Sequence, residues 1–573
     1  MALNCLKGQA LKWCSCSSHE CRKSIMKTSE KILFPILFLC VFLGALVVGL
    51  FIGARYGISV NRNSTSTISF APAGSSGDKL NQFISTLDAM YVDSINVDSL
   101  VDDAIVDILA KLDPHSSFIP ASDIEDVNSQ LSGNFYGVGI QFSIMQDTVN
   151  VVAVIPGGPS DGTGIVAGDR IINVDDSLFV GKKITNEKVL HTLRGEDGTK
   201  VKLDIKRNGV DTLLHYVVKR GKVEVKSVDA SLMLDKSVGY VRINQFGATT
   251  YSEFVSALAE LRDKGANRFV VDLRDNPGGL LDAVIAMLNE LLERGQMIVY
   301  AEGNHYPRAN AMADGLGAFQ KYPVVVLVNE FSASASEIFS GAIQDNDRGL
   351  IIGRRTFGTG LVQQQMDFND KSAMRLTVAR YYMPSGRCIQ RHYKLGDTDN
   401  YYLDIFDRYE RGELYNKDSV LTADTTKYYT VGGRVVYGGG GVMPDIFIPR
   451  DTSYYSKYYN AVFNLALPYQ FAYHYVDMHR DRLKAYPTWQ KAEDALKAAN
   501  LLQEFRVYVK QRNGLEPNAE DAKCYKELQR WLISNIIRDA RGDKDFFAIF
   551  TRDDPMVQLA VKKAHTLSTH VKQ

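Results

Sequence analysis

The spacing of apolar residues changes along the chain, and each change predicts a different kind of structure. From about 79 to 132 apolar residues recur every three or four positions, as at Leu80, Phe83 and Leu87, which predicts a small helical region. From 133 to 220 they alternate, as in "VNVVAV" and "KVKLDIKR", which are separated by the turn-rich "IPGGPSDGTG". Alternation of this kind predicts a small β-rich domain.

The segment 223–450 contains two strand-turn-helix units. "NRFVVDLRDNPGG" leads into the amphipathic "LLDAVIAMLNELLERG", and "YPVVVLVNEFSASAS" leads into "EIFSGAIQDN" and the short strand "GLIIG". Continuous apolar strands that alternate with helices predict buried parallel strands in an α/β core. Residues 451–573 have a mostly helical pattern and no recognisable chemistry, so we interpret them as an appendage for packing or oligomerisation.

One apolar run stands apart from these patterns. Residues 32–54, "ILFPILFLCVFLGALVVGLFIGA", carry no charge and at about 1.5 Å per residue would extend roughly 34 Å, enough to cross a hydrocarbon layer of about 30 Å. The run is longer than the apolar stretch of a cleaved signal peptide, which is about 7 to 15 residues, so we expect an uncleaved transmembrane anchor. The Ser/Gly-rich residues 55–78 are interpreted as a linker that follows it.

Charge determines the expected orientation of this anchor. Arg22, Lys23, Lys27 and Lys31 precede the run, so residues 1–31 should remain in the cytoplasm and the bulk of the chain should lie outside the inner membrane. In a bacterium with two membranes that compartment is the periplasm. The whole chain has 66 basic and 66 acidic residues, so its field does not favour nucleic acid as a partner.

Cysteine use indicates neither a disulfide framework nor a metal site. Four of the seven cysteines precede the expected anchor, and Cys14, Cys16, His19 and Cys21 fit no standard zinc spacing. Met26 opens "MKTSEK", a natural start for an anchored protein, so residues 1–25 are interpreted as a dispensable or misassigned extension. The chain also has neither HExxH nor a phosphate loop that ends in Lys-Ser/Thr, so we expect no metal, nucleotide or redox cofactor.

Three serines alternate in "NEFSASASEIFSGAIQD", at 332, 334 and 336. A serine on the turn between a buried strand and a helix is placed as an exposed nucleophile would be, with the helix N-terminus near a developing oxyanion. The competing interpretation is structural, because Ser334-x-x-Glu337 is a capping box in which Ser334 only caps a helix that starts at Ala335. On these residues alone the structural interpretation is favoured.

A glycine-containing loop opens the β-rich region. In "YGVGIQF" two glycines flank an apolar residue, so that successive backbone N–H groups can point into one concavity and bind a chain-terminal carboxylate beside an added strand. The following "GPSDGTGIVAGDRIINVDD" resembles the turn and strand of PDZ domains. Residues 133–220 are therefore identified as a PDZ domain that binds polypeptide C-termini, with Tyr136, Gly137, Val138, Gly139 and Ile140 as its carboxylate loop.

Eight motifs between about 79 and 450 occur in the order seen in carboxy-terminal processing, or tail-specific, serine proteases. Besides the PDZ string they are "LDPHSSF" (112–118), "YVRINQF" (240–246), "DLRDNPGG" (272–279), "FSASASEIFSGAIQD" (331–345), "RRTFGTGLVQQ" (354–364), "LTVARYYMPSGRCIQ" (376–390) and "GGGVMPD" (439–445). The resemblance implies that residues 223–450 are the protease core. The implied fold is a multidomain α/β protein: an N-terminal membrane anchor helix, a small helical region, a PDZ domain, the α/β protease core and a helical C-terminal region.

The resemblance also implies site residues. Ser334 matches the nucleophile and Gln363 the orienting glutamine, and the N–H groups of Ala335 and of Gly278 or Gly279 would hold the oxyanion. The family's general-base lysine falls on Thr359, in "TFGTG". A threonine hydroxyl passes on a hydrogen bond but cannot hold the serine proton.

Two functions follow from that substitution. One is a membrane-anchored serine endopeptidase that binds protein or peptide tails through its PDZ domain and cleaves them through an acyl-enzyme. Association with further copies of the chain, as a homo-oligomer, is compatible with this function. The other is a pseudoprotease that binds C-termini as an adaptor. No replacement base stands out: Lys371, His392 and Lys394 are expected on the surface, and His115 is expected to make a structural hydrogen bond.

Overall fold

The computed structural model describes residues 76–421 and 424–568. The chain divides into two units, 1–95 and 96–573, and the described part of the first holds helix α2 (Ser76–Met90). The predicted anchor at 32–54 and the cytoplasmic segment before it lie outside the described residues. No helix in the described ranges is long and apolar enough to cross a membrane.

The second unit is built on a six-stranded sheet with the order β10-β11-β12-β15-β16-β21. Four neighbouring pairs, from β11 to β21, are parallel, and only β10 runs antiparallel to its neighbour. The apolar runs quoted above supply the central strands, and β15 is buried at every position. The strand bounds are β10 Val228–Met233, β11 Val238–Ile243, β12 Arg268–Asp272, β15 Val324–Val328, β16 Gly349–Gly353 and β21 Ile446–Phe447.

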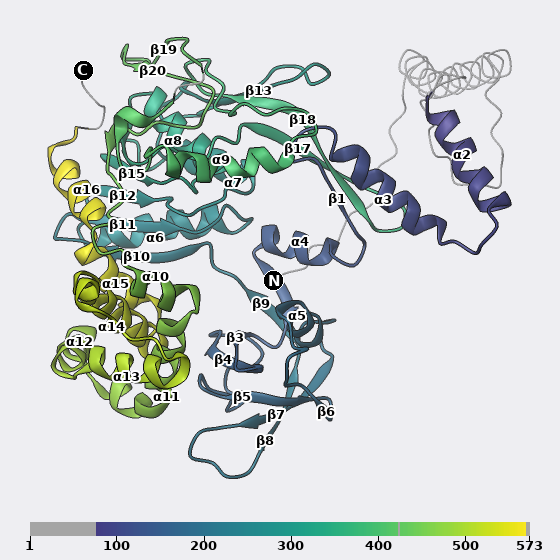
Figure 1. Ribbon diagram of the computed structural model, residues 1–573. Coiled ribbons are helices and arrows are strands. Elements are labelled where there is room, and N and C mark those ends of the chain that lie inside the picture. Colours follow the sequence, from purple (N-terminus) through teal and green to yellow (C-terminus); the bar gives the residue numbers. More distant parts are fainter. Residues whose placement is uncertain (1–75, 422–423, 569–573) are drawn as a thin grey trace, which may run out of the picture. The chain divides into compact units, whose positions relative to one another are not determined.

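Helices cover both faces of this sheet (Figure 1). One face packs against α6 (Thr250–Asp263), α7 (Leu281–Asn289) and α8 (Ala335–Asp345). The other face packs against α15 (Asp543–Asp553) and α16 (Pro555–Thr566), through Phe547, Met556, Val557, Ala560 and Ala564. Helices α15 and α16 therefore complete the α/β core, whereas the sequence pattern places them in the helical appendage at 451–573, expected to serve packing or oligomerisation.

A second sheet lies beside the first core and has the order β1-β18-β13-β14, with β17 also paired to β18. Its strands are β1 Ser117–Ile119, β13 Met297–Glu302, β14 Ala309–Met312, β17 Leu361–Asp367 and β18 Ala373–Tyr382. Strand β1 comes from the "LDPHSSF" motif, so the region predicted to be helical also contributes a strand to the core. The helices of that region in this unit are α3 (Val97–Leu109) and α4 (Ile124–Ser132).

The PDZ region has its own sheet, β3-β4-β5-β7-β8, with β6 paired to β5, and its own apolar core. The bounds are β3 Ile140–Met145, β4 Thr148–Val154, β5 Arg170–Val174, β6 Ser177–Leu178, α5 Asn186–Leu193, β7 Lys200–Lys206 and β8 Leu214–Lys219. A short pair, β2 (Asn134–Gly137) and β9 (Gly221–Glu224), begins and ends the region. The predicted opening strand is thus divided in two at Val138 and Gly139.

The helices α10 to α14 form a separate core. They are α10 Lys457–Asn464, α11 Leu467–Ala485, α12 Trp489–Ala498, α13 Leu501–Asn513 and α14 Tyr525–Arg541. Helix α9 (Thr398–Glu410) and the hairpin β19–β20 (Tyr428–Tyr429 and Val435–Val436) belong to the insertion before β21. The short 3-10 turns are Lys417–Ser419 and Ala519–Cys524.

Candidate active site

The alternating serines lie where β15 passes into α8, and the structure separates their roles. Ser332 is fully buried, and its hydroxyl donates to the Leu273 carbonyl at 2.7 Å. Ser336 is also buried, and its hydroxyl donates to the Asn276 carbonyl at 3.0 Å. Both hydroxyls therefore join this turn to the end of β12, and Ser334 is the partly exposed member of the three.

Ser334 has a backbone conformation that few side chains adopt. Its φ is 52° and its ψ is −113°, in a region that favours glycine. A strained residue on a sharp strand-to-helix turn is typical of exposed nucleophiles, because the turn lifts the side chain above the sheet. Ser334 also forms the predicted capping box with Glu337 at the start of α8, so a structural role accompanies its exposed position.

Glu337 completes the other half of the predicted capping box and does more than cap. Its Oε2 accepts from Ser334 N–H at 2.9 Å and from Thr359 N–H at 2.7 Å, and its Oε1 accepts from Gly358 N–H at 2.8 Å and Thr356 Oγ1 at 2.5 Å. The carboxyl group is fully buried. Burial raises its pKa, while the four hydrogen bonds act in the opposite direction. One side chain thus joins the Ser334 turn to the loop that carries Thr359.

The glycine turn after β12 packs directly against the serine turn. A Cβ on Gly278 would lie 2.8 Å from the Ser334 Cβ, and a Cβ on Gly279 would lie 2.1 Å from the Phe246 carbonyl oxygen, so only glycine fits at either position. Asn276 holds the two turns together, because its carbonyl accepts from Ala333 N–H at 3.0 Å and its Oδ1 accepts from Gly278 N–H at 2.8 Å.

These contacts show which of the expected oxyanion donors are already hydrogen-bonded within the fold. Gly278 N–H is already donated to Asn276, so it is engaged within the turn. Within the described ranges, no acceptor bonds the N–H of Gly279 or of Ala335, the first residue of α8. Ala335 N–H also lies at the positive end of that helix.

Ser334 opens into a pocket of about 860 Å³. Its wall combines loops that follow β12, β15 and β16, the last of which carries Thr359, with one face of β17, where Leu361, Gln363 and Gln365 alternate. The carboxyl ends of neighbouring parallel strands meet at one edge of a sheet, which is where ligands bind in α/β folds. The apolar part of the wall is Leu131, Leu280, Leu281, Phe331, Phe357, Leu361 and Tyr381.

Gln363 lies in this pocket and contacts the "LDPHSSF" motif. Its Nε2 donates to the His115 carbonyl at 2.6 Å. The His115 ring is also engaged, because its Nε2 lies 2.9 Å from the Tyr401 hydroxyl, as expected for a structural histidine. Burial lowers the pKa of His115, so its imidazole is neutral near pH 7.

No lysine is among the residues that line this pocket. Thr359 stands in the wall, and the ionisable lining side chains are His115, Asp275, Arg375 and Tyr381. Burial raises the pKa of Tyr381 to about 12, and Asp275 is held by Asn329 Nδ2 at 2.7 Å. Lys371, His392 and Lys394 are exposed and do not line the pocket, as predicted.

The predicted carboxylate loop connects β2 to β3. Gly139 has a φ of 75°, and a Cβ there would lie 2.8 Å from Pro159 Cδ. Val138 and Ile140 are buried, Tyr136 is exposed, and Gly137 is paired with Gly221. Across the part of the chain that the structure describes, no acceptor bonds the N–H of Val138 or Gly139. Strand β3 is at the edge of its sheet, which leaves one side for an added strand.

Two residues that organise the site were not predicted in those roles. Asn276 lies inside the quoted "DLRDNPGG", but its contact with Ala333 spans two separate loops and leaves no periodic signal. Glu337 was predicted as a capping residue only, and its bonds to residues 356–359 depend on tertiary packing.

Comparison with known proteins agrees with this architecture. A model of peptidase family S41 matches residues 237–399, a PDZ domain model matches 137–216, and a family of unknown function matches 458–542. The class that these matches define is a serine peptidase with a PDZ domain.

Individual relatives are more specific. A carboxy-terminal-processing protease of Bartonella bacilliformis is 37% identical over 307 residues, which cover 52% of this chain and 69% of that protein. Carboxy-terminal processing protease CtpA of Bacillus subtilis is 30% identical over 450 residues, which cover 70% of this chain and 94% of that protein. The chain belongs to the carboxy-terminal processing proteases of peptidase family S41.

One solved structure is also similar. The photosystem II D1 C-terminal processing protease has 28% sequence identity and a TM-score of 0.35, covering 66% of this chain and 87% of that chain.

Proposed function

We propose that the chain is a serine endopeptidase that binds polypeptide C-terminal tails through its PDZ domain and cleaves peptide bonds with Ser334. The observation that carries the proposal is the Ser334 turn, whose positive φ presents one hydroxyl to the pocket while the neighbouring serines are bonded inside. Ser334 Oγ would attack the scissile carbonyl, the amine would leave, and water would cleave the resulting acyl-enzyme.

The oxyanion would be held by two backbone donors. Ala335 N–H and Gly279 N–H are both adjacent to the Ser334 turn, and among the described residues neither has a hydrogen-bond acceptor, so they can bond a developing negative charge. Of the two glycines named from the sequence, Gly279 is the proposed donor because Gly278 N–H is bonded to Asn276.

Substrate binding is assigned to the loop Tyr136–Ile140. The free N–H groups of Val138 and Gly139 suit a terminal carboxylate, and the tail would extend along the open edge of β3 by strand addition. Protein or peptide substrates with accessible tails are the partners that this arrangement supports. The proposed inner-membrane anchor at 32–54 would place residues 79–573 outside the cytoplasm.

The residue Thr359 favours a second candidate function, one without efficient catalysis. Thr359 stands where the family resemblance places a lysine, and loss of a general base typically costs about 100- to 10,000-fold in rate. The alternative is therefore a catalytically impaired protein that binds C-termini as an adaptor.

Labelling with a serine-directed fluorophosphonate tests the nucleophile. The proposal expects covalent labelling that maps to Ser334 and disappears in Ser334→Ala. Labelling no greater than in that variant, together with retained binding of a tailed peptide, would favour the adaptor.

Substitution of Thr359 by lysine tests the missing base. Because a neutral lysine could accept the serine proton, Thr359→Lys should raise cleavage of a tailed substrate at least about a hundredfold. Thr359→Met is the matched control, since it has similar bulk and no basic nitrogen. An equal rate in both variants would show that the base is not the defect.

A further inference from the structure

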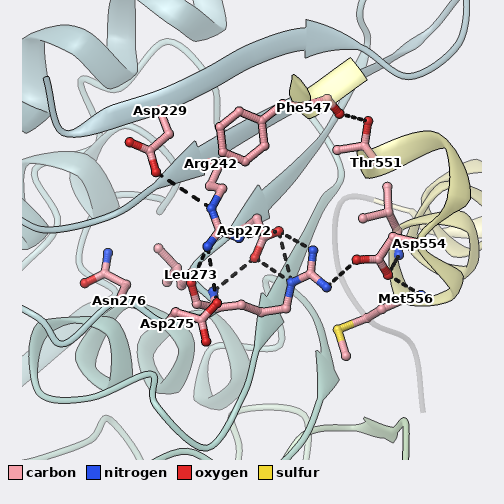
Figure 2. A network of polar contacts seen from close by, with 12 residues as sticks. Asp229, Arg242, Asp272, Leu273, Asp275, Asn276, Phe547, Thr551, Asp554 and Met556 are labelled. Atoms are coloured by element: carbon pink, nitrogen blue, oxygen red, sulfur yellow. Dashed lines mark hydrogen bonds and ion pairs between the residues drawn. The ribbon is translucent and has the colours of Figure 1, made fainter. Parts of the chain in front are cut away.

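Helices α15 and α16 meet at Asp554, which contacts the turn after β12. Its Oδ1 caps α16 by accepting from Met556 N–H at 2.8 Å and Val557 N–H at 3.3 Å. Its Oδ2 accepts from Arg274 Nη1 at 2.6 Å. Figure 2 shows Asp554 beside the polar network around Asp272 and Arg242. Arg274 lies two residues after the end of β12, in "DLRDNPGG". The ion pair therefore joins two residues that are 280 positions apart in the sequence.

The ion pair is part of a buried network. Arg274 also bonds Asp272, with Nη2 to Oδ2 at 2.6 Å, and Arg242 Nη1 lies 3.4 Å from the same oxygen. Asp272 is fully buried, and Arg274 and Asp554 are each 8% exposed. Burial disfavours the charged form of Asp272, but the two arginines outweigh it and lower its pKa to about 2.

Aromatic rings of α15 cover the same arginines. The guanidinium carbon of Arg242 lies 5.7 Å from the Phe547 ring centroid, and that of Arg274 lies 5.8 Å from the Phe550 centroid. The C-terminal helices therefore supply both a carboxylate and a low-polarity cover for these cations, which strengthens the ion pairs.

Residues next to Arg274 hold the serine turn. Arg242 Nη2 donates to the Arg274 carbonyl at 3.2 Å, so the backbone of that residue is bonded as well as its side chain. Asp275 N–H donates to Asn329 Oδ1 at 2.9 Å, and the Asn276 carbonyl accepts from Ala333 N–H at 3.0 Å. The backbone at 274–276 thus determines where the Ser334 turn and Gly279 N–H lie.

We propose that Asp554 is a positioning residue of the active site, which acts through Arg274 to fix the turn after β12 and with it the Ser334 turn. The inference rests on the proposed function, because its effect is to hold Ser334, the proposed nucleophile, in its reactive position. It assigns a role in catalysis to the C-terminal helices, which contribute no residue to the pocket.

Asp554→Asn separates the ion pair from the cap. Asparagine is as good an N-cap as aspartate, so α16 keeps its first turn, but the neutral amide cannot pair with Arg274. The rate of fluorophosphonate labelling of Ser334, per folded molecule, should fall about 10- to 100-fold, because small displacements of a reacting group have effects of that size. Affinity for a tailed peptide should not change.

A second readout does not need activity. Hydrogen exchange of the full chain, followed by mass spectrometry, should show faster exchange in peptides that span 272–280 and 329–340 in Asp554→Asn. Exchange in the PDZ strands should stay as it is in the unsubstituted chain.

Two variants serve as matched controls. Asp553→Asn makes the same chemical change one position earlier, where the carboxylate pairs with Arg552 on the surface. Val557→Ala weakens the packing of α16 on the sheet and leaves the ion pair intact, so it reports the effect of lost stability alone. Both should label at nearly the unsubstituted rate at a temperature where they are folded.

The outcomes decide between a positioning role and a merely structural one. If Asp554→Asn labels and exchanges like Val557→Ala at a similar loss of melting temperature, Asp554 is only a helix cap and the inference is wrong. If Asp554→Asn does not fold, Arg274→Lys replaces it, because lysine keeps the charge without the fork; slower labelling at retained melting temperature supports the inference, and an unchanged rate overturns it. If the unsubstituted chain does not label, the proposed function fails, while the exchange comparison still decides this one.

Discussion

Single side chains at this site act mainly by hydrogen bonding to backbone in another loop. Glu337 bonds the N–H groups of Ser334 and Thr359 through one oxygen, so it fixes the distance between the proposed nucleophile and the position where the family resemblance places a lysine. The sequence predicted the cap, since Ser-x-x-Glu is a local pattern. It could not predict the contacts with residues 356–359, because they depend on where β16 lies.

Replacement of Glu337 by glutamine should damage the site. The side-chain amide would place an NH₂ group against two N–H donors, leaving buried donors unpaired at a cost of about 2–4 kcal/mol of unfolding free energy, and labelling of Ser334 should slow at least tenfold. Glu493→Gln is the control, because that buried carboxylate pairs with Arg552 far from the pocket. Equal labelling rates in the two variants would contradict the role given to Glu337.

Asp539, on α14, predicts a pH dependence of stability. Burial raises its pKa from 3.8 to about 6, so the folded chain keeps a proton that the unfolded chain loses in this range. The contribution of Asp539 to the free energy of unfolding therefore falls as pH rises from about 4 to 6 and stays constant at higher pH. Asp539→Asn, which is neutral at every pH, should be more stable than the unsubstituted chain by about 1–3 kcal/mol at pH 8 and by little at pH 4.

Calorimetric melting temperatures at pH 4 and pH 8 check this expectation. Asp481→Asn, an exposed position on α11, is the control and should change neither value much. A gain for Asp539→Asn of the same size at both pH values would contradict the assigned cause.

At the scale of elements, two turns at the ends of parallel strands determine the geometry of the site. The strand-turn-helix pattern predicted both turns and the start of α8 at Ala335, and the structure confirms them. The pattern could not show which glycine N–H remains free, since that depends on the Asn276 side chain. Periodicity also missed strand β1, because a three-residue strand is too short to show alternation.

Gly278→Ala should therefore act on catalysis as well as on stability. The added Cβ would lie 2.8 Å from both Ser334 Cβ and the Ala333 carbonyl oxygen, so the serine turn must move, and labelling should fall at least about a hundredfold. Gly295→Ala is the control, since that glycine has a φ of 82° and no neighbouring atom within 4 Å. Its cost should be confined to about 1–2 kcal/mol of stability. Similar labelling in both variants would mean that close packing of the two turns is unimportant.

At the scale of the whole molecule, tail binding and peptide hydrolysis are assigned to regions with separate apolar cores. The PDZ core and the protease core share no buried residue, so a local change in one should leave the other folded. The same reasoning applies to the C-terminal region in part only, because α10–α14 have their own core whereas α15 and α16 pack on the protease sheet.

The two functions should therefore separate by mutation. Gly139→Ala places a Cβ 2.8 Å from Pro159 in a backbone conformation that disfavours alanine, and should weaken binding of a tailed peptide at least tenfold while Ser334 still labels. Ser334→Ala should bind the same peptide normally and lose labelling. Fluorescence anisotropy with a free-acid peptide and its C-terminal amide measures the binding. Loss of labelling in Gly139→Ala would show that the two regions are coupled.

Local patterns in the sequence were sufficient for the main strand-turn-helix units and for the serine at the strand-to-helix turn, because period and turn residues act over short stretches of chain. Ordered motifs that resemble a known family located the PDZ and protease regions. The tertiary structure alone decided which backbone N–H groups stay free, that Gln363 bonds His115, and that Asp554 reaches Arg274. The last two contacts join residues more than two hundred positions apart. They form only when packing of the sheets brings distant loops to one edge, and no local spacing of residue types encodes that approach.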